Sequence, residues 1–334
     1  MARYKVYRLH FTSPLHISDI RDDASVSQRT VHSDTLQAAL LAALAKVGEV
    51  LPENGDIGCV VSDLFPYYQK TEESKPVYFL PMPMQTTLPC LNNPADAKKV
   101  KKVQWVDSKL FSQIINGDRF EWNDDNMRMI KAAYLTGEEL PAVGNFVCSE
   151  VMQRVKIEDR TGIGDAKPYY VDRISFRDYA GLYFLVRETD NTSILEKALT
   201  ILVEEGIGTD RNVGYGFFDV SKDDEPLVID TPADAEYQMA LSMFIPESSE
   251  QLNRMIEGEG VAYDFVRRGG WITSTTLRKN AIYAFLPGSV FCKTTDDDVL
   301  GAIVDLRPKN TPQPIQHPVW RNGKSIMIPI KTAI

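Results

Sequence analysis

The chain has 334 residues, 43% of them hydrophobic and 25% charged, a composition that excludes a collagenous, a disordered or a membrane-spanning protein. Its formal net charge of -9 argues against a sequence-blind nucleic-acid binder, because such a protein needs a broadly basic surface. The charge is uneven: residues 217–266 hold 12 acidic and two basic residues, a balance of -10, whereas residues 98–109 and 267–331 are basic.

The length favours two domains, and the first is predicted to span residues 1–222. It opens with apolar and polar residues that alternate over 4–11, the pattern of a half-exposed strand. After a loop, Ser33 is predicted to cap a helix that carries an apolar stripe. Residues 55–144 have the least regular pattern and look like an insertion, with one short strand over 77–80.

Regular patterns return after that insertion. Residues 151–176 are predicted to form a β-hairpin, and residues 182–187 a further strand. The helix predicted over 193–205 has an apolar stripe and a capping box of Ser193 and Glu196. A glycine-rich loop and a strand follow, and the whole order fits a split β-α-β unit of the ferredoxin-like kind.

The second domain is predicted to span residues 237–334, after an acidic linker at 223–236. It begins in the same way as the first, with a strand over 237–245 and a helix that starts at a capping pair of Ser248 and Gln251. Several short strand patterns complete it. The predicted fold class is therefore α+β, with two units that are rich in antiparallel strands.

The glycine-rich loop over 206–216 is the most distinctive motif. It is not a dinucleotide-binding fingerprint, because that motif follows a strand and opens a helix, whereas this loop follows a helix and opens a strand. Its four glycines, with Arg211 and Asn212 between them, would let a polynucleotide backbone approach the main chain. The alternative interpretation is a helix C-cap followed by a bulge at the start of the strand.

Basic and aromatic residues are interleaved in two places. One is the lysine run at 98–102, with Trp105 close by, and the other is the predicted hairpin, where arginines accompany Tyr169 and Tyr170. Cations for phosphates and flat rings for unstacked bases are what a single-stranded nucleic acid requires. Acidic residues nearly balance the hairpin, however, so a solvated antiparallel ribbon fits its charge about equally well.

No catalytic or metal-binding constellation is evident. A histidine is the usual base for attack by a 2′-hydroxyl, and His16 and His32 could approach each other, but neither has a legible partner. The four cysteines form no C-x-x-C unit, so no zinc site is expected, and no other metal or cofactor is predicted. Without a secretory signal or an apolar segment long enough to cross a bilayer, a cytoplasmic location and no membrane partner are expected.

Seven sequence blocks, in order along the chain, resemble the repeat-associated mysterious protein (RAMP) superfamily of CRISPR effector subunits. The blocks are Phe11–Ile17, His32–Leu36, Phe79–Pro81, the glycine-rich loop, Arg267–Trp271, Gly288–Phe291 and His317–Gly323. The similarity is greatest to the Csm subunit of type III-A complexes that caps the 5′ end of the guide RNA. One departure is Met82, which stands between two prolines where the family pattern has a lysine.

This resemblance implies two ferredoxin-like domains, a β-hairpin thumb and a non-catalytic role in antiviral defence. The implied partners are the 5′ repeat-derived handle of crRNA, the large Cas polymerase and nuclease subunit, a Csm backbone subunit, and target RNA near the 5′ end of the guide. Two alternatives are kept: a CRISPR RNA-processing endoribonuclease of the same superfamily with His16 or His32 as base, and an α+β protein that binds a small phosphorylated ligand.

The residues expected to contact RNA lie in the glycine-rich loop, in the two basic regions or in the family blocks. They are His16, Ser33, Lys102, Arg154, Arg160, Gly206, Gly208, Arg211, Asn212, Gly214, Gly216, Arg268 and Trp271.

Overall fold

The computed structural model of the chain describes residues 1–18, 24–84, 101–118, 128–130, 133–138, 145–157, 166–272, 275–309 and 315–331. In this part of the chain the helices are α1 (Ser33–Lys46), α3 (Ser108–Asn116), α4 (Ser193–Glu205) and α5 (Ser249–Ile256), with a 3-10 turn at Arg211–Val213. None of these helices combines the length and the apolar content needed to cross a membrane.

The first sheet has the strand order β10-β1-β9-β2-β3-β4-β6-β5, and β11 pairs with β1. Its strands are β1 (Ala2–Phe11), β2 (Phe65–Tyr68), β3 (Val77–Pro81), β4 (Trp105–Asp107), β5 (Arg128–Ile130), β6 (Tyr134–Thr136), β9 (Ala180–Arg187), β10 (Phe218–Lys222) and β11 (Leu227–Ile229). Each neighbouring pair in the row β10, β1, β9 and β2 is antiparallel, whereas β4 and β6 run parallel. Helix α1 lies between β1 and β2 in the chain, and α4 lies between β9 and β10.

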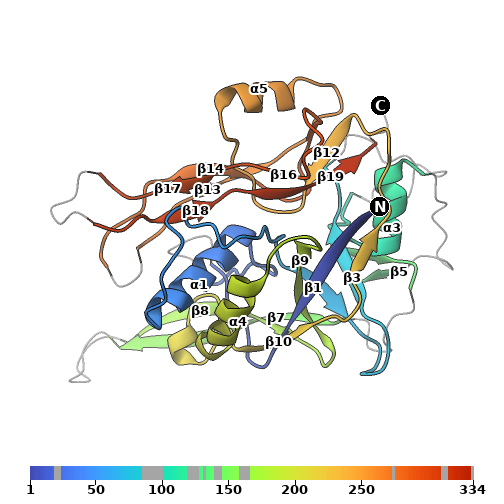
Figure 1. Cartoon of the computed structure of the whole chain (residues 1–334). Coiled ribbons are helices and arrows are strands. Elements are labelled where there is room, and N and C mark those ends of the chain that lie inside the picture. Colours follow the sequence, from blue (N-terminus) through green and yellow to red (C-terminus); the bar gives the residue numbers. More distant parts are fainter. Residues whose placement is uncertain are drawn as a thin grey trace.

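The C-terminal half forms a second sheet and two ribbons. The sheet has the order β15-β12-β19-β16, and the ribbons are β13-β14 and β17-β18. The strands are β12 (Tyr237–Ala240), β13 (Phe265–Arg268), β14 (Ile282–Phe285), β15 (Val290–Cys292), β16 (Val299–Leu300), β17 (Ile303–Asp305), β18 (Trp320–Asn322) and β19 (Ser325–Ile330). Helix α5 covers the side of this sheet that faces away from the first sheet (Figure 1).

The first sheet is buried on both faces. On one face, Leu9 of β1 shares a core with Leu36 of α1 and Leu199 of α4. On the other face, Val6 of β1 shares a core with Ile328 of β19. Because successive residues of a strand point to opposite sides, β1 contributes to both cores and ties the two halves of the chain into one body.

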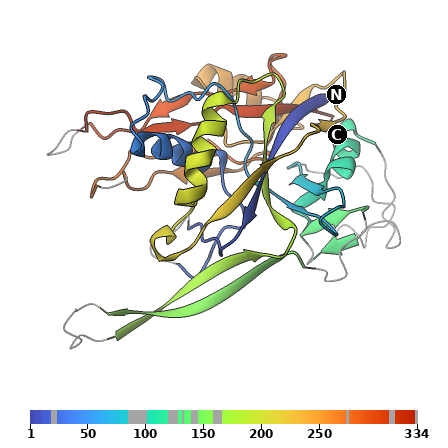
Figure 2. The ribbon, with the colours of Figure 1, turned by 60° about the horizontal axis from the view of Figure 1, so that its bottom comes forward.

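The hairpin of β7 (Val147–Ile157) and β8 (Ala166–Phe176) forms a separate two-stranded sheet. Figure 2 shows it as a green ribbon that projects from the body of the molecule, close to the end of α4. Its base is anchored to the first core by Ile174, which is fully buried. The hairpin predicted over 151–176 is confirmed, and it extends a few residues further toward the body.

Several local predictions are confirmed and two caps are wrong. The α+β class, the strand at 77–80 and the helix at 193–205 all match the structure. The N-cap of α1 is His32 rather than Ser33, and the N-cap of α4 is Thr192. Ser33 Oγ bonds to the distant Met243 N instead of capping α1. Glu196 accepts hydrogen bonds from Tyr7, Lys222 and the N-cap residue Thr192 rather than from Ser193.

The capping pair of α5 is confirmed, since Ser248 Oγ accepts a hydrogen bond from Gln251 N at 3.1 Å. Two other segments are more structured than their composition indicates. The described part of 55–144 supplies β2, β3, β4, β5 and β6, all of which belong to the first sheet. The acidic segment 223–236 contains β11, which pairs with the start of β1.

Candidate nucleic-acid interface

The glycine-rich loop connects α4 to β10 and closes on itself. At its base, Ile207 N donates to Gly216 O at 2.9 Å, and Gly216 N donates to Pro14 O at 2.8 Å. Thr209 N donates to His16 O at 3.0 Å. These bonds fix the loop against the segment after β1, and the 3-10 turn at its outer end is left exposed.

The four glycines of the loop all have positive φ, but the space around them differs. A Cβ on Gly206 would lie 2.9 Å from Gly216 O, one on Gly208 would lie 2.6 Å from His16 O, and one on Gly216 would lie 1.9 Å from Ile207 O. A Cβ on Gly214 would meet nothing within 4 Å. Three glycines therefore let the loop pack on itself and on the segment after β1, and only Gly214 leaves the main chain open to an approaching molecule.

The outer end of the loop offers hydrogen-bond donors. Arg211, Asn212 and Gly214 are exposed, and Asp210 has a left-handed backbone with φ of 60°. Within the described residues, the amides of 210, 211 and 212 make no hydrogen bond to the protein. Successive amides that point outward from such a turn form a concave donor site for an anionic oxygen.

The charges beside this turn are mixed. A hollow of about 480 Å³ is lined by Lys46, Glu204, Glu205 and residues 208–212. Lys46 pairs with Glu205, whereas the Arg211 guanidinium lies 4.0 Å from the same carboxylate. Arg211 Nη1 also donates to Gly206 O at 3.5 Å, so an incoming phosphate would compete with two long contacts.

The hairpin reaches the loop through Arg154. Its Nη1 lies 3.1 Å from Asp210 Oδ2, and its guanidinium stacks 4.7 Å from the centre of the Tyr215 ring. Tyr169 stands opposite Arg154 across the two strands, and it is half exposed. Opposite residues of a strand pair share a face, so a base stacked on Tyr169 would lie next to the loop.

The structure encloses three of the other predicted residues. His16 is 2% exposed, with Nδ1 2.7 Å from Asp172 O, and it touches the loop only through its carbonyl oxygen. Ser33 is also buried, and its Oγ accepts a hydrogen bond from Met243 N at 2.9 Å. Arg268 is committed to an ion pair with Asp34. Their roles as RNA contacts stay predictions, and their protein contacts give them a structural role as well.

The remaining predicted residues are dispersed. Lys102 is exposed in the turn before β4. Trp271 is half exposed in the loop after β13, and Arg278 stacks 4.9 Å from its ring centre. Arg160 lies outside the described residues. The structure thus brings Arg154 to the glycine-rich loop but leaves Lys102 and Trp271 on other elements.

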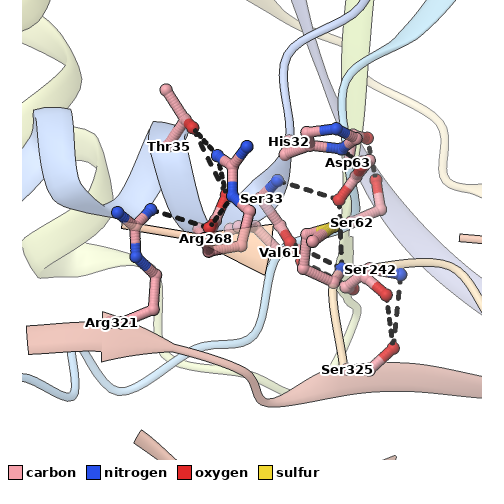
Figure 3. A network of polar contacts seen from close by, with 12 residues as sticks. His32, Ser33, Thr35, Val61, Ser62, Asp63, Ser242, Arg268, Arg321 and Ser325 are labelled. Atoms are coloured by element: carbon pink, nitrogen blue, oxygen red, sulfur yellow. Dashed lines mark hydrogen bonds and ion pairs between the residues drawn. The ribbon is translucent and has the colours of Figure 1, made fainter. Parts of the chain in front are cut away.

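Two buried carboxylates join the two halves of the chain (Figure 3). Asp34 is 1% exposed and accepts hydrogen bonds from Arg268 Nε at 2.8 Å and from Arg321 Nη1 at 2.7 Å. Burial would raise the pKa of Asp34, but Arg321 and Arg268 outweigh it and hold that pKa well below its usual value. Burial and then Arg321 lower the pKa of Lys279, beside them, to about 8.

Asp63 is the second of these carboxylates. Its Oδ1 accepts hydrogen bonds from Ser33 N at 2.8 Å and Met243 N at 3.1 Å, and its Oδ2 lies 2.6 Å from His32 Nδ1. Burial lowers the pKa of His32, but the negative charge of Asp63 outweighs it and the net shift is upward. Sequence reasoning missed both carboxylates, although Asp34 lies inside one of the family blocks.

His16 and His32 are both engaged with the protein, His16 with Asp172 O and His32 with Asp63. His32 and Asp63 have the geometry of a base and its orienting carboxylate. The same carboxylate holds two backbone amides at the junction, so the pair stabilises the fold there. Among the described residues there is no group of three His, Cys, Asp or Glu side chains that could hold a metal ion.

The α+β fold and the blocks along the chain are similar to those of RAMP-type CRISPR effector subunits. Residues 233–330 match the family model of the CRISPR Csm4 C-terminal domain. This match agrees with the resemblance to the Csm subunit that the sequence blocks predicted.

The resemblance to Csm4 proteins extends over most of the chain in the curated relatives. The CRISPR system Cms protein Csm4 of Streptococcus thermophilus is 24% identical over 323 residues, which cover 93% of this chain and 95% of that protein. The protein of the same name from Methanocaldococcus jannaschii is 23% identical over 313 residues, covering 76% of this chain and 79% of the relative.

Solved structures share the fold. A chain in the crystal structure of the Csm3-Csm4 subcomplex of the type III-A CRISPR-Cas interference complex superposes with a TM-score of 0.62 at 18% identity, with 98% of this chain and 99% of that chain covered. A chain of the Csm1-Csm4 cassette in complex with pppApA gives a TM-score of 0.56 at 16% identity, with 99% of both chains covered.

Proposed function

We propose that this chain is a non-catalytic subunit of a type III-A CRISPR (Csm) interference complex. In that complex it binds the 5′ repeat-derived handle of crRNA and bridges the large polymerase and nuclease subunit to the backbone subunits. The curated Csm4 relatives, one of which matches over 93% of the chain, support this assignment. The matching folds come from assemblies named for Csm1 with Csm4 and for Csm3 with Csm4.

The observation that carries RNA binding is the exposed outer turn of the glycine-rich loop. Residues 210–212 present amides that make no hydrogen bond within the described part of the chain, Arg211 is loosely held, and Gly214 leaves the main chain open. Amides of this kind and a guanidinium both bind phosphate oxygens. The adjoining hairpin face adds Arg154 and Tyr169, a cation and a ring.

The finer fold assignment is part of the same proposal. The order β10-β1-β9-β2, with α1 and α4 as the connecting helices, is that of a ferredoxin-like unit. The second unit begins in the same order, with strand β12 and then helix α5. The projecting hairpin of β7 and β8 would be the thumb.

The loop is tested with two variants and a matched control. Arg211→Ala should weaken binding of a labelled 5′-handle RNA and reduce the salt slope by about 1, because one phosphate contact is lost. Gly214→Val should weaken binding by obstructing close approach. Gly117→Val is the control, since Gly117 also has positive φ and an uncrowded Cβ position but lies at the end of α3.

Binding is measured across a salt series after circular dichroism has shown that each variant folds. If both loop variants bind the handle with the affinity and salt slope of the wild type, the loop is only a helix cap.

The competing function is RNA processing, which the His32–Asp63 pair favours by its geometry. The purified chain should not cleave a labelled repeat RNA. Cleavage at one position without added metal, abolished by His32→Ala or His16→Ala in a folded variant, would establish the endoribonuclease instead.

A further inference from the structure

One face of the β13-β14 ribbon carries exposed rings and a cation side by side. Phe265 pairs with Phe285 in the strand register, and the next pair outward on the same face is Arg267 with Tyr283. Phe265 is 51% exposed, Tyr283 is 61% exposed, and Arg267 is exposed as well. The ring centres of Phe265 and Tyr283 lie 5.6 Å apart. The ribbon therefore presents two neighbouring aromatic rings to solvent, with a guanidinium beside them.

Beyond Tyr283 the side chains on this face become small. The next two residues on the face are Gly269 and Ala281, and a Cβ on Gly269 would lie 3.6 Å from the Ala281 Cβ. Past them, Trp271 bridges to Arg278, whose guanidinium lies 4.9 Å from the centre of the indole ring. Two pairs of a ring and an arginine thus flank a low floor, where a flat base could approach the backbone.

The arginines of this surface are not compensated by the protein. Within the described part of the chain, neither Arg267 nor Arg278 has a carboxylate partner. Both belong to the basic region 267–331. The acidic residue that adjoins the rings, Asp264, lies at the inner end of the face, where its carboxylate accepts a hydrogen bond from Phe265 N at 2.8 Å. The surface therefore becomes more positive toward its outer end.

Alternating rings and uncompensated cations suit a single-stranded nucleic acid. Unpaired bases stack on aromatic rings and on guanidinium planes, while cations meet the phosphates between them. The core of a protein interface is more continuous and more apolar than this surface, which Arg267 and the low floor interrupt. The chemistry of the face therefore favours RNA over a protein partner.

This face lies apart from the glycine-rich loop. Arg268, next to Arg267 in β13, points to the opposite side of the ribbon and pairs with Asp34 at the start of α1. The other end of α1 reaches the loop, since Lys46 lines the hollow beside residues 208–212. A helix of 14 residues is about 20 Å long, so one nucleotide cannot contact the loop and the exposed face of the ribbon together. Figure 1 shows α1 and α5 on opposite sides of the ribbon, and the exposed face is on the side of α5, because Phe285 shares a core with that helix.

We propose that the exposed face of the β13-β14 ribbon binds unpaired nucleotides of the 5′ handle other than those at the glycine-rich loop. Bases would stack on Tyr283 and Phe265, and a phosphate between them would meet Arg267. Stacking requires unpaired bases, and the repeat-derived handle lies outside the guide sequence that pairs with target RNA. This inference rests on the proposed function, in which the chain holds the handle, and it adds a second site for the same RNA.

The first test measures the affinity of the full chain for a labelled 5′-handle RNA across a salt series. Tyr283→Ala should weaken binding at least about fivefold, because one stacked base is lost, whereas Tyr283→Phe keeps the ring and should bind nearly as tightly as the wild type. Arg267→Ala should reduce the salt slope by about 1. Lys75→Ala is the control and should change neither quantity, because it removes an exposed cation from the turn between β2 and β3. A Tyr283→Phe variant that binds as weakly as Tyr283→Ala would overturn the stacking.

The second test locates the nucleotides. The assembled complex with guide RNA and target RNA is crosslinked by ultraviolet light, and the peptide–RNA adducts are identified by mass spectrometry. Adducts at Tyr283 or Phe265 should carry handle nucleotides that differ from those crosslinked to residues 206–216. Ribbon adducts only with the spacer or with target RNA would overturn the assignment to the handle.

The remaining outcomes separate this inference from the proposed function. If Tyr283→Ala and Arg267→Ala bind the handle like the wild type while Arg211→Ala binds it more weakly, the second site is overturned and the proposed function stands. If the wild type does not bind the handle, both are overturned. If the ribbon variants change only the affinity for a protein subunit, the face belongs to a protein interface and the proposal is overturned.

Discussion

Removal of the charge of Asp34 is expected to destabilise the chain strongly. Asp34 pairs with both Arg268 and Arg321, and the side chains of these three residues are 1%, 11% and 7% exposed. Asp34→Asn preserves the size of the side chain but removes the negative charge that both guanidiniums face. Within the described part of the chain, the other contact of the Arg321 guanidinium is a long one, 3.3 Å from Gly269 O.

The magnitude follows from the burial of the pair. Removing one partner of a buried ion pair costs about 3–5 kcal/mol, because the remaining charge stays desolvated. Arg268 can turn outward more easily than Arg321, so the lower end, about 3 kcal/mol, is expected here. Adding Arg268→Met to Asp34→Asn should restore part of the loss, since it removes one of the two buried positive charges that Asp34 compensates.

Urea unfolding followed by circular dichroism measures this effect. Glu188→Gln is the control: it breaks the exposed Arg3–Glu188 pair, 2.7 Å long, and should leave the unfolding midpoint unchanged. The pKa of Lys279, measured by its rate of reductive methylation, should fall below about 8 in Asp34→Asn, because Asp34 raises it in the wild type. A loss under about 1 kcal/mol, with Lys279 unchanged, would refute the account of Asp34 as a buried link.

Three further predictions concern single residues. Gly216→Ala should prevent folding or sharply lower the melting temperature, because its Cβ would lie 1.9 Å from a carbonyl oxygen, whereas Gly214→Ala should cost only about 1–2 kcal/mol for its positive φ. The raised pKa of His32 means that its pairing with Asp63 stabilises the fold fully below about pH 6.5 and less as the pH rises through the folded-state pKa, so the stability difference from His32→Gln should shrink with increasing pH. Arg154→Ala should change stability by less than about 1 kcal/mol, as for a partly exposed ion pair, yet increase hydrogen exchange at the hairpin where it meets the loop.

Local patterns were sufficient for much of the fold. The helix at 193–205 was predictable from its apolar stripe, and the hairpin at 151–176 from two strand patterns around a turn. Both patterns depend only on residues close together in the sequence. The α+β class followed from the order of such elements. The short strands β4, β5 and β6 were not predictable, since each has three residues and is defined by its sheet partners.

Long-range partners explain the remaining differences. Ser33 has the side chain of a typical N-cap residue, but its hydroxyl accepts a hydrogen bond from the amide of Met243, 210 residues away. The acidic segment 223–236 was predicted as a linker from its composition. It nevertheless contains β11, which pairs with the start of β1. In the glycine-rich loop, the sequence presented four equivalent glycines, and only the three-dimensional contacts separate Gly214 from the three that the packing requires.

The pattern of ion pairs bears on how such an acidic chain can bind RNA. Arg154, Arg268 and Lys46 each face a carboxylate of the protein, so their charge is largely compensated before any ligand arrives. Among the cations around the glycine-rich loop, Arg211 is less committed to the protein than Lys46 and Arg154, and the amides at the tip of the loop are open donors. Attraction from a distance is therefore weak, and affinity has to come from a few contacts made at short range with defined geometry. Contacts of that kind suit a subunit that holds one end of an RNA, because they discriminate by fit, whereas a protein that coats RNA along its length depends on many uncompensated cations.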